Sequence, residues 1–158
     1  MAASTYRIPD EPLPSAWSRQ VVDPMWPLLA VMLAGNAIGL AWFVFNGIAM
    51  GNPERHREWL WAGISLLLAL LLWLGLGYLL QQGVLDERSV RYAALLPVVV
   101  KLVVAYRLYQ GQTPCHELWE HYGGQSRNGM IPLVLMTLLL PALWSSSALH
   151  PLLLQVLR

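Results

Sequence analysis

The chain has 158 residues, of which 56% are hydrophobic and only 12% are charged. An ordinary soluble domain carries about 25% charged residues, so this composition predicts a protein whose surface faces lipid instead of water. Lys and Arg number 10 against 9 Asp and Glu, a net charge of +1 that gives no basis for binding nucleic acid. The single cysteine excludes an internal disulfide.

The first part of the chain predicts a surface tail followed by a transmembrane helix. Residues 1–24 are rich in proline, which removes backbone donors, so we expect an irregular tail at the membrane surface. The uncharged run 25–50 is long enough to cross a bilayer. Within it, Gly35 and Gly39 have the small-xxx-small spacing that lets another helix pack closely, inside the bundle or in a homodimer. Asn36, between them, predicts a polar contact with a neighbouring helix or a ligand.

Two further spans are expected, over about 58–82 and about 90–109. The third segment contains Pro97 and is short, so a kinked or shallow helix is also possible. It carries Lys101, and a lysine within a span costs about 2.5–3.5 kcal/mol on insertion scales. Lys101 therefore predicts a contact with an anionic ligand or partner carboxylate, or a side chain that reaches the interface. Arg107, nearer the end of the segment, joins it as a candidate contact.

A short interfacial helix is expected over about 114–122, because Pro114 can open a helix and the glycines that follow can stop it. His116, Glu120 and His121 fall on its polar face and would be the ligands if this helix bound a metal. Their order does not match the zinc-protease motif, and ion pairs along a solvated face are the alternative explanation.

The rest of the chain predicts a turn and a last span. The glycine-rich stretch 123–129 contains Arg127, which suits a phosphate or lipid head group, although a helix-stopping turn also explains the glycines. The last apolar stretch is expected to span over about 130–150. Pro141 and a run of serines leave open one kinked helix or a shorter span followed by a surface helix from about residue 151.

Together these segments predict an all-α integral membrane protein. We expect a bundle of about four transmembrane helices, with residues 25–158 forming a single domain and the interfacial helix preceding the last span. The expected location is a multi-pass position in a cell membrane, a bacterial inner membrane. Arginines are divided almost evenly between the two sides of such a bundle, and they weakly favour cytoplasmic termini.

The sequence contains no nucleophile elbow, phosphate loop, dinucleotide fingerprint or paired intramembrane carboxylates, so we expect no cofactor and favour a protein that is not an enzyme. The first hypothesis is a binding or accessory protein that docks against another membrane protein or itself. In layout, though not in any motif, the chain resembles immunity proteins against pore-forming bacteriocins. The alternatives are a subunit of a small-solute or ion transporter or channel, and an enzyme acting on lipid head groups. The candidate contacts are Lys101, Asn36, Arg107 and Arg127.

Overall fold

The computed structural model describes residues 15–145 and 151–157, and these residues form helices and no strand. In chain order the helices are η1 (Ser18–Gln20), α1 (Met25–Leu33), α2 (Asn36–Met50), α3 (Arg55–Gln81), α4 (Glu87–Ala93), α5 (Leu95–His121), α6 (Met130–Ser145) and α7 (Pro151–Leu157). Two helical stretches, Arg55–Gln81 and Arg88–His121, are long and apolar enough to cross a membrane. The fold class is therefore all-α, with two helices of crossing length where about four were expected.

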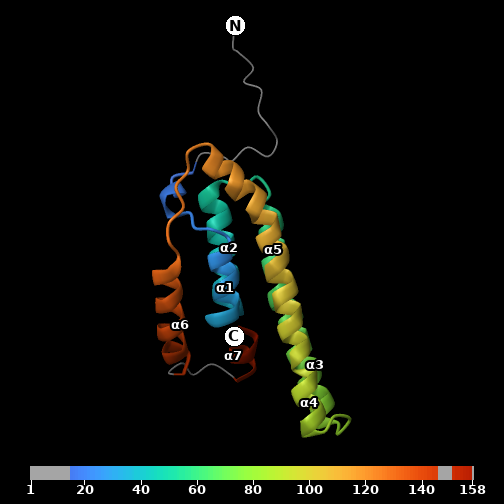
Figure 1. The fold of residues 1–158 in the computed structure, drawn as a ribbon. Helices are drawn as coiled ribbons and strands as arrows, with labels where there is room; N and C mark the ends of the chain where they lie inside the picture. Colours follow the sequence, from blue (N-terminus) through green and yellow to red (C-terminus); the bar gives the residue numbers. More distant parts are fainter. Residues whose placement is uncertain (1–14, 146–150, 158) are drawn as a thin grey trace.

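The segment 25–50 is not one span but a helical hairpin of α1 and α2 (Figure 1). Gly35 separates the two helices with φ 115°, a backbone conformation that only glycine adopts readily, and the chain reverses there. A Cβ atom on Gly39 would overlap the backbone of Val31, so α1 and α2 lie in close contact at this glycine. The expectation of a single span was wrong because an uncharged run with small residues fits a hairpin as well as a straight helix.

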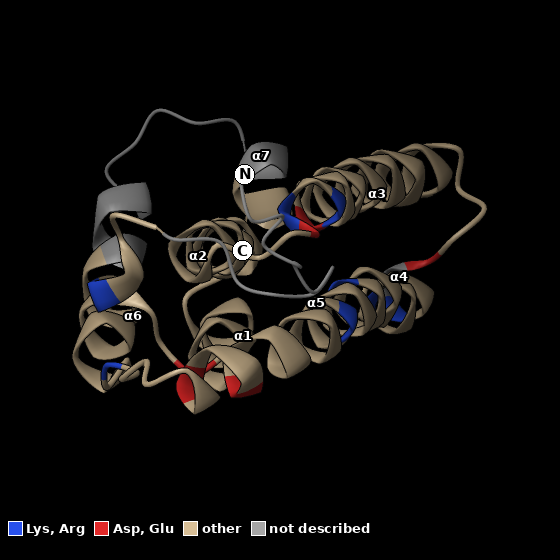
Figure 2. Ribbon diagram, turned by 90° about the horizontal axis from the view of Figure 1, so that it is seen from above, with Lys and Arg blue, Asp and Glu red and all other residues tan. Residues whose placement is uncertain are grey.

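The helices α3 and α5 form a long antiparallel pair that extends beyond the hairpin, with α4 at its far end (Figure 1). Asp86 caps α4 by accepting a hydrogen bond of 3.1 Å from the Ser89 N–H. Seen from above, α6 lies on the other side of the hairpin, and most of the described ribbon carries no charged residue (Figure 2). The bundle therefore presents long apolar surfaces with charge confined to a few places.

The α1–α2 hairpin is the centre of the core. Its apolar side chains meet α3 and α5 on one side and α6 on the other. The first contact contains Val31, Leu40, Phe43, Ala62, Val104, Ala105 and Leu108. The second contains Val22, Ala30, Trp42 and Leu133. Because residues 21–24 also contribute buried side chains, the end of the expected surface tail is part of the core.

The expected interfacial helix 114–122 is instead the last part of α5, with Pro114 inside the helix. The Thr113 hydroxyl donates to the Tyr109 carbonyl at 2.8 Å and so stays within the same helix instead of starting a new one. The neighbouring Cys115 and His116 are buried, so these turns pack against the rest of the bundle. In Figure 1 the last turns of α5 lie over the end of α2.

Pro141 and the run of serines left two alternatives open for the end of the chain. The structure has the second, a helix α6 followed by a separate helix α7. The first described residues and α7 lie toward opposite ends of the hairpin (Figure 1). Residues 1–14, 146–150 and 158 of the expected tail and last span lie outside the described part of the chain.

Candidate functional site

A cavity of about 270 Å³ lies where the turn of the hairpin meets α3, α5 and α7. We call it the Asn36–Lys101 pocket. Its lining residues are Asn36, Ala69, Trp73, Pro97, Val98, Lys101, Gln155 and Val156. Two residues singled out from the sequence, 65 positions apart in the chain by their numbers, thus line one cavity.

Asn36 is the most unusual polar group of this pocket. Its side chain is only 1% exposed, and within residues 15–145 and 151–157 neither its amide nitrogen nor its amide oxygen has a hydrogen-bond partner. Leaving a buried donor or acceptor unpaired costs about 1–3 kcal/mol. Lys101, half-buried on α5, adds an ammonium group to the same lining. An amide and an ammonium together are suited to hold a carboxylate or another small anion.

The local backbone explains how these two side chains reach the pocket. Asn36 is the first residue of α2, so the glycine turn before it sets its position. Pro97 lies in the first turn of α5, where backbone N–H groups have no helical partner, so it costs no helical hydrogen bond. The expected segment 90–109 is interrupted at Ala94, between α4 and α5 and three residues before Pro97, and Lys101 lies in the longer helix α5.

A second polar cluster lies at the other end of the hairpin, and we call it the Glu58 network. Gln112 on α5 donates to the Glu58 carboxylate at 3.0 Å and to the Phe43 carbonyl at 2.7 Å. Asn52 donates to the other oxygen of Glu58 at 2.6 Å. Asn46 on α2 donates to the Gln112 side-chain oxygen at 3.3 Å. The network therefore links α2, α3 and α5 through buried side chains.

The Glu58 network also fixes the segment before α1. The Asn46 side chain accepts from the Val22 N–H and donates to the Val22 carbonyl, both at 3.0 Å. The Arg127 N–H in turn donates to the Val21 carbonyl at 2.8 Å. One buried asparagine thus positions both the start of the hairpin and the loop that leads to α6.

Nothing in the sequence singled out Glu58, which stands at the first position of the span expected over about 58–82. It lies in the first turn of α3, yet its side chain is only 5% exposed. A Cβ atom on Gly47 would overlap the Glu58 carboxylate, so this glycine makes room for it. The available signal was the pair of amides, Asn46 and Gln112, within otherwise apolar stretches.

The structure places Arg107 away from the Asn36–Lys101 pocket. Arg107 lines a space of about 20 Å³ together with Glu54, Arg57 and Glu58. That volume holds about one water molecule. Lys101 and Arg107 therefore do not form a joint site, although both are on α5.

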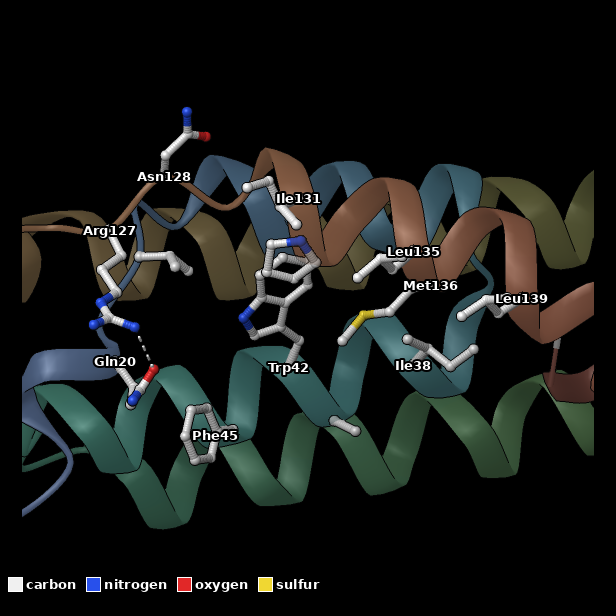
Figure 3. Close-up of a pocket in the computed structure, with 13 residues that line it drawn as sticks. Gln20, Ile38, Trp42, Phe45, Arg127, Asn128, Ile131, Leu135, Met136 and Leu139 are labelled. Carbon is white, nitrogen blue, oxygen red and sulfur yellow. Dashed lines mark hydrogen bonds between the residues drawn. The ribbon is translucent and has the colours of Figure 1, made fainter.

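Arg127 lies at the polar end of a third feature, the α2–α6 groove, which has a volume of about 880 Å³ (Figure 3). Gln20 and Asn128 accompany it there, and the Arg127 guanidinium donates to the Gln20 side-chain oxygen at 3.4 Å. The apolar walls are formed by Ile38, Trp42 and Phe45 of α2 and by Ile131, Leu135 and Leu139 of α6.

The metal hypothesis for His116, Glu120 and His121 is not supported by their positions. In the described residues, no three His, Cys, Asp or Glu side chains come together to hold a metal. His116 is buried with its Nε2 atom 3.8 Å from Glu120, while the His121 ring contacts Tyr122 instead. Since consecutive helical residues point about 100° apart, Glu120 and His121 diverge.

Comparisons with known protein families, with curated proteins and with solved structures find no match to this chain. Function must therefore be argued from the residues and their geometry.

Proposed function

We propose that this chain is a small integral membrane protein that binds another membrane protein, with a carboxylate from a partner helix entering the Asn36–Lys101 pocket. The observation that carries the proposal is the buried Asn36 amide, which has neither of its hydrogen-bonding atoms paired and lines a cavity beside an ammonium group. This is the accessory or immunity-type role that the composition and size favour.

Aromatic residues support a membrane position for α3 and α5. Exposed Trp59 and Trp61 lie near one end of α3, and exposed Tyr78 lies near the other. Trp59 and Tyr78 are roughly 28 Å apart along the axis at about 1.5 Å per residue, close to the thickness of a hydrocarbon core of about 30 Å. By the same rise, Lys101 lies roughly 13 Å from exposed Tyr92, near the middle of the bilayer.

The α1–α2 hairpin then enters the membrane and returns to the same side. Lipid requires every backbone group to be satisfied, and irregular backbone at this depth must be buried. Gly35 meets both conditions: it is buried, its N–H donates to the Ala30 carbonyl at 3.0 Å, and its carbonyl accepts from Gly39 at 3.1 Å. We propose that α3 and α5 cross the bilayer beside this re-entrant hairpin.

This topology also favours an orientation. The segment before the hairpin, which contains Arg19, lies at the end of the bundle that holds the start of α3 and the α5–α6 loop. That end carries Arg19, Arg55, Arg57 and Arg127, whereas the α3–α4 end carries Arg88 and Arg91. By the positive-inside rule the first end is cytoplasmic, in a multi-pass protein of a bacterial inner membrane.

A carboxylate on the partner helix would supply the acceptor that the buried Asn36 amide nitrogen lacks, beside an ammonium group. A charged group at mid-span is expensive alone, and intramembrane acids and bases are found paired with each other. A second copy of this chain is a poor source of that acid, because Glu58, the acid one turn into α3, is buried and bonded in the Glu58 network. The partner is therefore a different membrane protein.

Energy transfer in liposomes tests the proposal with a designed leucine-rich transmembrane helix carrying one central Glu. The full chain should associate about tenfold more tightly with this helix than with the same helix carrying Gln, since a charge-assisted hydrogen bond is roughly twice as strong as a neutral one. Lys101→Met and Asn36→Leu should each remove the preference. Arg107→Met, a lost cation on the same helix but outside the pocket, should keep it.

Equal association of the two helices with the wild-type chain would contradict the proposal. Flux measurements with the same liposomes separate it from transport: we expect no ion or small-anion flux. A flux that Lys101→Met abolishes would replace docking by a transporter or channel role.

A further inference from the structure

We infer that the α2–α6 groove is a binding site for one anionic phospholipid, with the lipid phosphate on Arg127 and an acyl chain along the groove. This inference concerns a different face of the bundle from the Asn36–Lys101 pocket and does not depend on the proposed partner. Three features of the groove carry it: its polar end, its length and the reason it stays open.

The polar end offers a cation that the protein does not neutralise. In the described part of the chain, no acidic side chain forms an ion pair with Arg127, and its guanidinium meets only the neutral Gln20 amide at 3.4 Å. The nearby Glu120 carboxylate accepts a hydrogen bond from the Ser126 hydroxyl at 2.9 Å. An arginine presents several donors in a planar fork that matches a phosphate group.

Hydrogen bonds fix the backbone position of Arg127. Its own N–H is bonded to the Val21 carbonyl, and the neighbouring Val22 is held on both sides by Asn46. Asn128 accepts a hydrogen bond of 2.9 Å from the Met130 N–H at the start of α6. The backbone beside the guanidinium is thus tied to the buried Glu58 network, so the charge stays at the mouth of the groove.

The length of the groove matches one leaflet. Arg127 and Leu139 lie at its two ends, and the helical part from Met130 to Leu139 spans roughly 14 Å along the axis at about 1.5 Å per residue. Half of a hydrocarbon core is about 15 Å. Apart from Gln20, Arg127 and Asn128 at its mouth, the lining is apolar (Figure 3). A charged mouth followed by one leaflet's depth of apolar wall matches the two parts of a phospholipid.

The groove stays open because α6 is fixed at its start and small residues line its side. A Cβ atom on Gly129 would overlap Trp26, so the start of α6 lies tightly against α1. Further along, Ala41 is exposed on α2 and leaves space that a larger side chain would fill. Trp42, only 8% exposed, forms part of the apolar wall.

Native mass spectrometry of the delipidated full chain tests this site with dioleoyl phosphatidylglycerol and dioleoyl phosphatidylcholine. We expect one phosphatidylglycerol to be retained about tenfold more tightly than phosphatidylcholine, from the charge-assisted contact to Arg127. Arg127→Gln should remove this preference. Arg91→Gln, which removes an exposed arginine at the opposite end of the bundle, should leave it unchanged.

A groove-filling variant tests the acyl-chain part separately. Ala41→Phe should weaken retention of both lipids while far-UV circular dichroism stays unchanged. Equal retention of the two lipids by the wild-type chain, or unchanged retention in Ala41→Phe, would overturn the inference. So would competition by glycerol 3-phosphate as strong as that of the whole lipid, because the head group alone would then account for binding.

Discussion

The Glu58 network and the Asn36–Lys101 pocket are two polar clusters in the same apolar bundle, and they differ in how completely they are satisfied. Gln112 alone makes two donor contacts and accepts a third, so the first cluster is closed within the protein. Asn36 has both amide atoms unpaired and lines a cavity. Buried polar groups are normally hydrogen-bonded, and an unpaired one in a native protein needs an explanation. The closed cluster holds helices together, whereas we propose that the open one receives a group from outside the chain.

The largest effect on stability is expected from Gln112→Leu, which removes three hydrogen bonds of the Glu58 network. The change leaves Glu58, Asn46 and the Phe43 carbonyl each without one partner. Because several buried groups lose partners at once, one of them a carboxylate, the free energy of unfolding should fall by about 3–5 kcal/mol. Unfolding by denaturant in detergent micelles measures this. A loss below about 1 kcal/mol would mean that the network contributes little, and the contrast between the clusters would fail.

A smaller effect is expected from Gly39→Val, which disturbs the hairpin that brings Asn36 to its pocket. The new side chain would overlap Val31 where α1 and α2 are in contact, and overpacking of this kind costs about 1–3 kcal/mol. Gly63→Ala on α3 is the matched control, because nothing lies within 4 Å of the added methyl group. The same unfolding measurement should show no loss for the control, and equal losses would argue against the close contact.

Asn36→Leu should leave stability unchanged or raise it by about 1 kcal/mol, since it removes an unpaired buried amide. The expected change in the free energy of unfolding is opposite in sign to that of Gln112→Leu, so these two variants separate the two clusters most clearly. Unfolding should be compared with association to the Glu-bearing helix, which the variant should weaken. A loss of stability as large as that of Gln112→Leu would show that Asn36 has a structural role instead.

The smallest effect is expected at Asp86, an exposed carboxylate that can be compared with the buried carboxylate of Glu58. Hydrogen bonds from the side chain and backbone of Ser89 hold the pKa of Asp86 below its ordinary value of 3.8. Because the folded-state pKa is lowered, this cap is fully present above the ordinary value and is lost as the pH falls through the lowered one. Hydrogen exchange of the Ser89 amide should speed up only in that acid range. Faster exchange near neutral pH would contradict the cap.

The sequence was enough to predict an all-helical fold with helices long and apolar enough to cross a membrane, and the longest leucine-rich run became α3. The hairpin was not predictable from composition, because the φ of 115° at Gly35 depends on what packs around it. Pro114 is a common first residue of a helix, yet here the burial of Cys115 and His116 keeps it inside α5. Tertiary packing decided both cases against the local signal.

The candidate residues also divide into those that the sequence could single out and those that only packing reveals. Lys101 and Asn36 could be selected singly, because polar groups in apolar runs are rare. Their common pocket depends on the hairpin, which was not expected, and on the packing of α7 against it, which the sequence does not specify. Glu58 was overlooked since sequence position alone places it with the exposed charges near Arg55 and Arg57. Burial, which follows from the fold, separates it from them.

The most direct test of a carboxylate site uses the fact that Lys101 is the only lysine in the sequence. Full-length protein labelled with ¹⁵N-lysine should give one side-chain ammonium signal, free of overlap. Adding the Glu-bearing helix should shift this signal in the wild-type chain, and the Gln-bearing helix should not. An unchanged signal at saturating Glu-bearing helix, or equal shifts with both helices, would contradict the proposed recognition of a carboxylate.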